Sequence, residues 1–190
     1  MAKLLYVDVE TTGLDAEKCE IVQFAAIVEI NGREMERFCI NIKPSDNCVW
    51  EPAAAEKNKL SPDIMNQYTP KDEAFNLIKS YLKKYVDTTR RDDKFFLVGY
   101  NVKFDEAFIR KFFNMVSGYE FTYSNFFWFP SLDIAQIIAI KTLDSRSVFP
   151  NFKLATLCRV LQVDFKDDNF HNAMYDIEKS RELFLKVLKK

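Results

Sequence analysis

The dipeptide Asn31-Gly32 constrains the fold of this 190-residue chain more than any other short segment. Asn-Gly favours the left-handed backbone that a two-residue hairpin turn requires. It stands between the apolar-rich segments 20–30 and 34–43, and segment 3–9 has the same strand-like character. The chain is therefore predicted to open with three antiparallel strands in a meander.

After the meander, apolar runs alternate with amphipathic patterns. Residues 95–99 predict a buried strand, and the aromatic stretch 119–129 fits no single element. We expect helices at 53–59, 62–67, 70–85, 104–115, 132–143, 152–162 and 173–188. This order is typical of an α/β fold with helices packed on a mixed sheet. The length favours a single domain over residues 1–190.

Composition narrows the classes of function. A formal net charge of −1 gives no support for a protein that simply coats nucleic acid. Apolar runs fall far short of the roughly 20 residues of a membrane span, and the N-terminus does not resemble a secretion signal. The four cysteines are scattered, and with one histidine they form no zinc motif. We therefore expect reduced thiols, a cytoplasmic location and no membrane partner.

Two acids lie close together on the first predicted strand. Asp8 and Glu10 are two residues apart, so their side chains leave the same face, while Val7 and Val9 face the opposite way. Adjacent carboxylates repel each other unless a cation binds them. Gly13 then lets the backbone turn tightly and approach a ligand. A metal site and a solvated strand end both remain open interpretations of the pair.

Further acids stand at the starts of two predicted helices. Asp105 follows the buried strand 95–99 and opens the next predicted helix. It either reaches a ligand-binding crevice at the end of the strand or complements the helix dipole as a first-turn acid. His171 and Asp176 are five residues apart, which on one helix separates them by about 140°. We therefore expect His171 in the preceding loop, Asn169 or Asn172 near the N-cap, and Asp176 in the early turns facing the sheet. An ordinary surface histidine is the alternative for His171.

Together these segments resemble the DnaQ-like 3′–5′ exonucleases of the DEDDh type, the family of the DNA polymerase III epsilon exonuclease domain. The matching motifs are Asp8-x-Glu10-Thr11-Thr12-Gly13-Leu14, Asn101-x-x-Phe104-Asp105 and His171-x-x-x-x-Asp176. The segment 151–157 and Asp133, expected to be structural, also resemble family features. The likeness spans residues 4 to 188, and the order and spacing of the motifs carry it.

The resemblance implies a ribonuclease H-like five-stranded mixed sheet, with an antiparallel meander plus parallel strands, flanked by helices. It implies a nuclease that hydrolyses phosphodiester bonds at the 3′ end of DNA and releases nucleoside monophosphates. Two divalent cations, Mg²⁺ or Mn²⁺, would be held by the acids Asp8, Glu10, Asp105 and Asp176, and balance their four negative charges. His171 would act as the general base that activates water.

The same resemblance implies the contacts with substrate, a single-stranded or frayed 3′ end of DNA or of RNA. The expected binding residues are Thr11, Thr12, Leu14, Asn101 and Phe104. The aromatic run Phe126 to Phe129 serves either base stacking or core packing.

Two features depart from the family pattern. Tyr100 stands where the second motif often has histidine. The sequence also ends soon after the third motif, so we expect a stand-alone enzyme, with a polymerase or replication partner left open.

Three alternatives remain at this point. The nearest is a 3′–5′ exoribonuclease that trims RNA or short oligoribonucleotides. A haloacid-dehalogenase-like phosphatase also places its nucleophile on a strand, as D-x-D-x-T, but Glu10 departs from that pattern. A non-catalytic binding module predicts lost acids, whereas all five catalytic-type residues are present.

Overall fold

The computed structural model describes residues 2–54, 62–166 and 172–188. Its strands are β1 (Lys3–Thr11), β2 (Ile21–Ile30), β3 (Arg33–Asn41), β4 (Phe96–Gly99) and β5 (Leu132–Asp133). They form one five-stranded sheet in the order β3-β2-β1-β4-β5. The first three strands pair antiparallel, whereas β4 and β5 run parallel to β1. The predicted mixed sheet is therefore confirmed, and extension to one domain over residues 1–190 stays a prediction.

The hairpin between β2 and β3 has the backbone that its sequence predicts. Asn31 has φ 52° and Gly32 has φ 76°, so both residues occupy the left-handed region. This turn matches the right-handed twist of the flanking strands. It places β3 at the edge of the sheet and leaves β1 beside β4.

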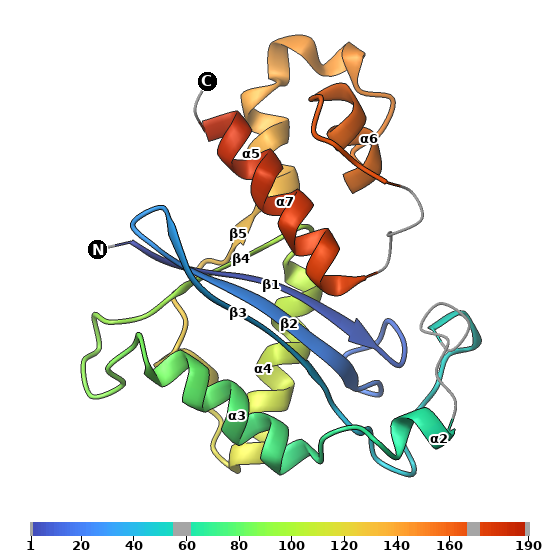
Figure 1. Ribbon diagram of the computed structural model, residues 1–190, viewed down its shortest axis with the longest axis vertical. Coiled ribbons are helices and arrows are strands. Elements are labelled where there is room, and N and C mark those ends of the chain that lie inside the picture. The colour runs from blue at the N-terminus through green and yellow to red at the C-terminus, as the bar shows by residue number, and fades with distance from the viewer. Residues whose placement is uncertain (1, 55–61, 167–171, 189–190) are drawn as a thin grey trace.

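Helices cover both faces of the sheet, as Figure 1 shows. The described α-helices are α2 (Pro62–Met65), α3 (Lys71–Lys83), α4 (Lys103–Ser117), α5 (Ile134–Lys141), α6 (Leu154–Val160) and α7 (Ala173–Leu188). Two 3₁₀ helices are η1 (Tyr123–Asn125) and η2 (Leu143–Val148). In Figure 1, α3 and α4 lie on one side of the sheet, and α5, α6 and α7 lie on the other.

Most predicted elements are confirmed, and the last helix has its predicted bounds. The prediction of a helix over residues 132–143 is wrong at its start, because Leu132 and Asp133 pair with β4 and the helix begins at Ile134. The predicted helix 53–59 falls partly on residues 55–61, which lie outside the described residues.

The core has two halves, one on each face of the sheet. Leu5, Val7 and Val9 of β1 pack in the cluster that includes α3 and α4. Tyr6, on the opposite face, belongs to the cluster that includes α5, α6 and α7. Because both faces are covered, β1 is apolar on both sides until its acids begin, and this confines those acids to its carboxyl-terminal end.

None of the described helices combines the length and the apolar character that a membrane crossing requires. All four cysteines are free, as predicted; Cys19 and Cys158 are buried, whereas Cys39 is exposed.

Candidate active site

The carboxyl-terminal end of β1 meets the first turn of α4. Pairing between β1 and β4 stops at Tyr6 and Val98, so β1 continues past the end of its parallel neighbour. Beyond that point, the backbone N–H of Val9 donates to Asp105 Oδ1 over 3.0 Å. The α4 carboxylate therefore takes the place of a strand partner, between the positions of Asp8 and Glu10 on β1.

The acids of β1 lie as the strand period predicts. Val7 and Val9 are buried in the α3–α4 half of the core, so Asp8 and Glu10 leave the opposite face. Asp8 is half-buried and Glu10 is buried. The register with β2 shifts between Glu10 and Thr11. Such irregularities redirect side chains and are frequent beside active sites.

A strained turn delivers Asp105 to this point. Asn101, between β4 and α4, has φ 56°, a left-handed conformation that asparagine tolerates better than most residues. Its N–H donates to Asp133 Oδ1 over 3.3 Å, and the same oxygen accepts the N–H of Ala135 over 2.9 Å. Asp133 thus caps α5 and anchors the β4–α4 turn, which supports its expected structural role.

The pKa values of two neighbouring acids on α4, Asp105 and Glu106, shift in opposite directions. Burial raises the pKa of Asp105, the Val9 N–H lowers it and the charge of Glu10 raises it, and the net pKa is raised. Burial also raises the pKa of Glu106, but hydrogen bonds from Lys103, Ser131 and Arg110 outweigh burial and lower it overall. Glu106 therefore has its own compensating partners, whereas the charges of described residues that act most on Asp105, those of Glu10 and Asp133, are negative.

The third motif reaches the site through α7. Asn172 Oδ1 accepts the N–H of Tyr175 over 3.2 Å, so Asn172 caps this helix as predicted. Asp176 lies in the first turn, and its neighbours on the helix surface, Ala173 three residues before it and Ser180 four residues after it, are buried. The helix packs on β1 and β2, so Asp176 is on the side that approaches the sheet, as predicted. His171 falls outside the described residues, and its position stays a prediction.

The predicted acids have the donor atoms that a divalent cation needs, although their side chains do not form a complete metal-binding group among the described residues. Across residues 2–54, 62–166 and 172–188, no three Asp, Glu, Cys or His side chains form a group that could hold a metal ion. Carboxylate oxygens are the donors that Mg²⁺ and Mn²⁺ prefer. The raised pKa of buried Asp105 indicates a site that positive charge would stabilise. Carboxylates that share a site disfavour each other's charged form, and an opposite charge nearby favours it.

A pocket of about 170 Å³ opens directly beside Glu10. Its lining residues are Val9, Glu10, Thr11, Gly13, Leu14, Glu51, Ala53, Ala54 and Phe104. Four of these, Glu10, Thr11, Leu14 and Phe104, were predicted as site residues, and the structure brings them together. Asn101 is exposed at the start of α4 and does not line this pocket.

The loop after β1 is built by its polar residues. Thr12 has 0% exposure; its N–H donates to the Glu20 carbonyl over 2.9 Å and its hydroxyl accepts the Glu20 N–H over 3.0 Å. Thr12 therefore closes the loop and offers no surface to a nucleotide in this conformation. The Thr11 hydroxyl donates to the Gly13 carbonyl over 2.7 Å. A Cβ on Gly13 would lie 2.5 Å from Cys19 Sγ and 2.6 Å from Glu51 Cδ.

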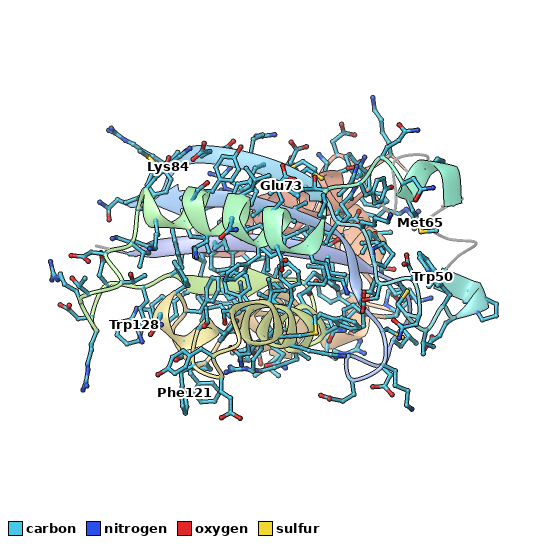
Figure 2. All side chains as sticks on the ribbon, turned by 90° about the horizontal axis from the view of Figure 1, so that it is seen from below. Trp50, Met65, Glu73, Lys84, Phe121 and Trp128 are labelled. Carbon is cyan, nitrogen blue, oxygen red and sulfur yellow. The ribbon has the colours of Figure 1, made fainter. Side chains whose placement is uncertain are left out.

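Sequence reasoning missed the far wall of the pocket, which residues 51–54 supply. The Glu51 N–H donates to the Thr12 carbonyl over 2.8 Å and ties this segment to the loop. In Figure 2, the neighbouring Trp50 lies at the end of the molecule opposite Lys84. A contact between an irregular segment and a distant loop leaves no periodic signal, so the sequence did not predict this wall.

The aromatic run 126–129 divides between core and surface. Phe126 and Phe127 are buried, which confirms the core-packing interpretation for them. Phe129, by contrast, is 78% exposed, and Lys103 Nζ at the start of α4 lies 5.4 Å from its ring centroid. Tyr100, which replaces the common histidine, donates its hydroxyl to the carbonyl of Phe152. That bond directs the Tyr100 side chain toward the segment before α6.

Comparisons with known proteins agree with this geometry. A model of the exonuclease family matches residues 5–184. The 3′-5′ exonuclease DinG of Bacillus subtilis (strain 168) is 29% identical over 192 residues, an alignment that covers 99% of this chain but 18% of DinG. Ribonuclease T of Wigglesworthia glossinidia brevipalpis is 25% identical, with 96% of this chain and 82% of the relative covered.

A solved structure of exonuclease I from E. coli, in complex with a dT13 oligonucleotide, superposes with a TM-score of 0.77. The two chains are 21% identical, and the match covers 100% of this chain and 41% of exonuclease I. At this identity the likeness shows the fold alone. The chain therefore spans well under half the length of DinG and of exonuclease I, and most of the length of ribonuclease T.

Proposed function

The chain belongs to the exonuclease family, with the ribonuclease H-like fold of the DnaQ-like 3′–5′ exonucleases, and from this premise we propose that it removes nucleotides from the 3′ end of single-stranded DNA. The products are nucleoside monophosphates. The observation that carries the proposal is the pocket beside Glu10, next to the point where Asp105 binds the backbone of β1. Family membership argues against the phosphatase alternative.

The pocket is suited to a chain terminus. Its volume of about 170 Å³ is below the roughly 300–1,000 Å³ of pockets that enclose a whole ligand, so it fits one terminal unit of a longer strand. Leu14 is 76% exposed and Phe104 half-buried, and they offer apolar surface to a base. Glu51 lines the same pocket, and its carboxylate is suited to accept a hydrogen bond from a sugar hydroxyl.

Asp8, Glu10, Asp105 and Asp176 are the residues we assign to a pair of Mg²⁺ or Mn²⁺ ions. When bound, such ions polarise the phosphate and lower the pKa of water. The protein holds the terminal nucleotide in the pocket, so that the preceding phosphate lies toward the acids. His171 accepts the proton of the attacking water, since imidazole titrates near neutral pH. The hydrogen bonds between Thr12 and Glu20 hold the loop after β1 in place and so fix the position of Leu14 relative to Glu10.

Phe129 offers a further exposed aromatic surface near the start of α4. Its exposed ring, beside the ammonium group of Lys103, is suited to stack on a base while the cation meets a phosphate. In Figure 2, a second exposed phenylalanine, Phe121, projects from the lower side of the molecule. It follows the C-terminal end of α4, which spans Lys103–Ser117, whereas the Phe129 ring lies beside Lys103 at the start of that helix.

RNA remains the second candidate substrate, because a relative of which this chain covers 82% of the length is named a ribonuclease. Matched DNA and RNA strands of one sequence, degraded in parallel, separate the two. A polymerase or replication partner stays a prediction for which the described surface offers no specific support.

The test of the proposed function is a time course on one oligonucleotide carrying a 3′ label or a 5′ label, with Mg²⁺. We expect mononucleotide release from the 3′ label at once and progressive shortening of the 5′-labelled strand. Asp8→Ala should abolish turnover in any divalent salt, whereas Asp92→Ala, at an exposed acid paired with Arg90, should leave it intact. Full activity in EDTA, or cleavage from the 5′ end, would refute the proposal.

A further inference from the structure

Arg181 of helix α7 forms ion pairs with two strands of the sheet. Arg181 Nε and Nη2 lie 2.8 and 2.7 Å from Glu29 Oε2 on β2. Its Nη1 lies 3.4 Å from Glu34 Oε2 on β3. One side chain therefore connects α7 to both β2 and β3. Arg181 leaves the helix about 140° around its axis from Asp176, because the two residues are five positions apart.

This connection lies largely out of water. Glu29 is 3% exposed, and the Arg181 guanidinium lies 5.8 Å from the centroid of the Tyr6 ring. The Phe184 ring meets Tyr6 edge-on at 6.0 Å between centroids. A buried ion pair with fixed ring neighbours has one favourable geometry, because displacement leaves a charge without its partner. Arg37 and Glu178 form a second ion pair between β3 and α7.

The residue spacing along β1 and α7 relates the contact between Arg181 and Tyr6 to the positions of Asp8 and Asp176. Asp8 lies two residues beyond Tyr6 on β1, about 6.7 Å along the strand. Asp176 lies five residues before Arg181 on α7, about 7.5 Å along the helix. Figure 1 shows that α7 runs opposite to β1 across the sheet. Placing Arg181 over Tyr6 therefore places Asp176 level with Asp8.

We propose that Arg181 is a positioning residue for the exonuclease reaction: its bond to Glu29 sets the register of α7 on the sheet and so holds Asp176 level with Asp8. The inference rests on the proposed function. The buried residues of α7 itself have small or apolar side chains, namely Ala173, Ile177, Ser180, Leu183, Phe184 and Val187. Apolar cores lose uniqueness before they lose stability, whereas a buried polar or ionic group can fix the register of a helix.

The test replaces the pair and leaves the site residues untouched. Arg181→Met alone would leave Glu29 buried without its cation and endanger folding, so the main variant is Arg181→Met with Glu29→Met. Replacing both members of a buried pair with apolar residues is often neutral for stability. The matched control is Lys179→Met with Glu182→Met, since that pair, at 2.9 Å, joins two residues of the same helix.

Three measurements distinguish positioning from general damage: calorimetric binding of Mn²⁺ to the protein without nucleic acid, thermal unfolding, and oligonucleotide kinetics. For the Arg181 and Glu29 double variant we expect Mn²⁺ affinity weakened about tenfold or more. We also expect a lower kcat with an unchanged KM for the oligonucleotide. The control pair should match the wild type.

Wild-type Mn²⁺ affinity and kcat in a folded double variant would overturn the proposal. If that variant does not fold, Arg181→Lys serves instead, because lysine keeps the charge and loses the planar fork. It should bind Mn²⁺ more weakly than the wild type, and equal affinity would overturn the proposal. A wild-type protein that neither binds Mn²⁺ nor shortens the oligonucleotide refutes the proposed function itself. A working wild type with an unaffected variant refutes only the role of Arg181.

Discussion

Asp105→Asn should stabilise the metal-free protein while it abolishes nuclease activity. The amide keeps an oxygen that can accept the Val9 N–H and removes the negative charge. Burial, aided by the charge of Glu10, raises the pKa of Asp105 from 3.8 to about 8. The folded protein therefore resists the ionised form that a metal site needs, which is the usual conflict between stability and function.

The sign and size of this effect follow from proton linkage. Between pH 3.8 and about 8 the folded carboxyl keeps a proton that the unfolded chain loses. The free energy of unfolding of the wild type thus falls as pH rises through that window, by at most about 1.4 kcal/mol per pH unit. At neutral pH the difference reaches about 4 kcal/mol as an upper limit. Below the unfolded pKa both states are protonated, and this contribution to the difference disappears.

Urea unfolding in EDTA, from about pH 5 to about pH 8, measures the effect. The stability of Asp105→Asn relative to the wild type should increase with pH, and added Mn²⁺ should stabilise the wild type far more than the variant.

Glu106→Gln is the matched control with the opposite sign. Burial raises the pKa of Glu106, but Lys103, Ser131 and Arg110 lower it overall. Its stabilising contribution is present above the ordinary value of 4.5 and is lost as pH falls through the lowered value. The glutamine variant should therefore be less stable than the wild type at neutral pH, and the difference should shrink in acid. A pH-independent difference for Asp105→Asn, or a trend like that of Glu106→Gln, would refute the reasoning.

Three further predictions concern the pocket, the exposed ring of Phe129 and the general base. Gly13→Ala places a methyl 2.5 Å from Cys19 Sγ, so we expect a loss of about 1–3 kcal/mol in urea unfolding together with reduced turnover; an unchanged midpoint contradicts the close approach. Phe129→Ala should raise the KM for single-stranded DNA about fivefold or more, while Phe121→Ala, at a ring 59% exposed, should not; equal effects of the two refute a specific stacking role. His171→Ala should lower kcat by about 10²–10⁴-fold with Mn²⁺ binding retained in calorimetry, and cleavage at the wild-type rate would exclude it as the base.

Local patterns predicted the elements that carry the site. The Asn31-Gly32 turn predicted the β2–β3 hairpin, and its left-handed backbone confirms it. The five-residue spacing between His171 and Asp176 predicted a cap at Asn169 or Asn172, and the structure shows a cap at Asn172. Such features depend on neighbours in sequence, so periodicity and turn chemistry detect them.

Features that depend on distant partners escaped prediction. β5 has two residues and is a strand only because Leu132 and Asp133 pair with β4. The wall of the pocket depends on the bond from Glu51 to Thr12. Arg181 and Glu29 are 152 positions apart. A pairwise contact between distant residues imposes no periodic pattern on either segment, so a single sequence does not predict it.

The most direct test of the carboxylate site is the position of bound metal. Crystals grown with Mn²⁺ and a nucleoside monophosphate, measured at the manganese absorption edge, show metal positions without assumptions about the protein. We expect anomalous peaks between the carboxylates of Asp8, Glu10, Asp105 and Asp176, with the nucleotide in the pocket beside Leu14. Manganese bound elsewhere, or a nucleotide in that pocket with no metal among these acids, would contradict the assignment.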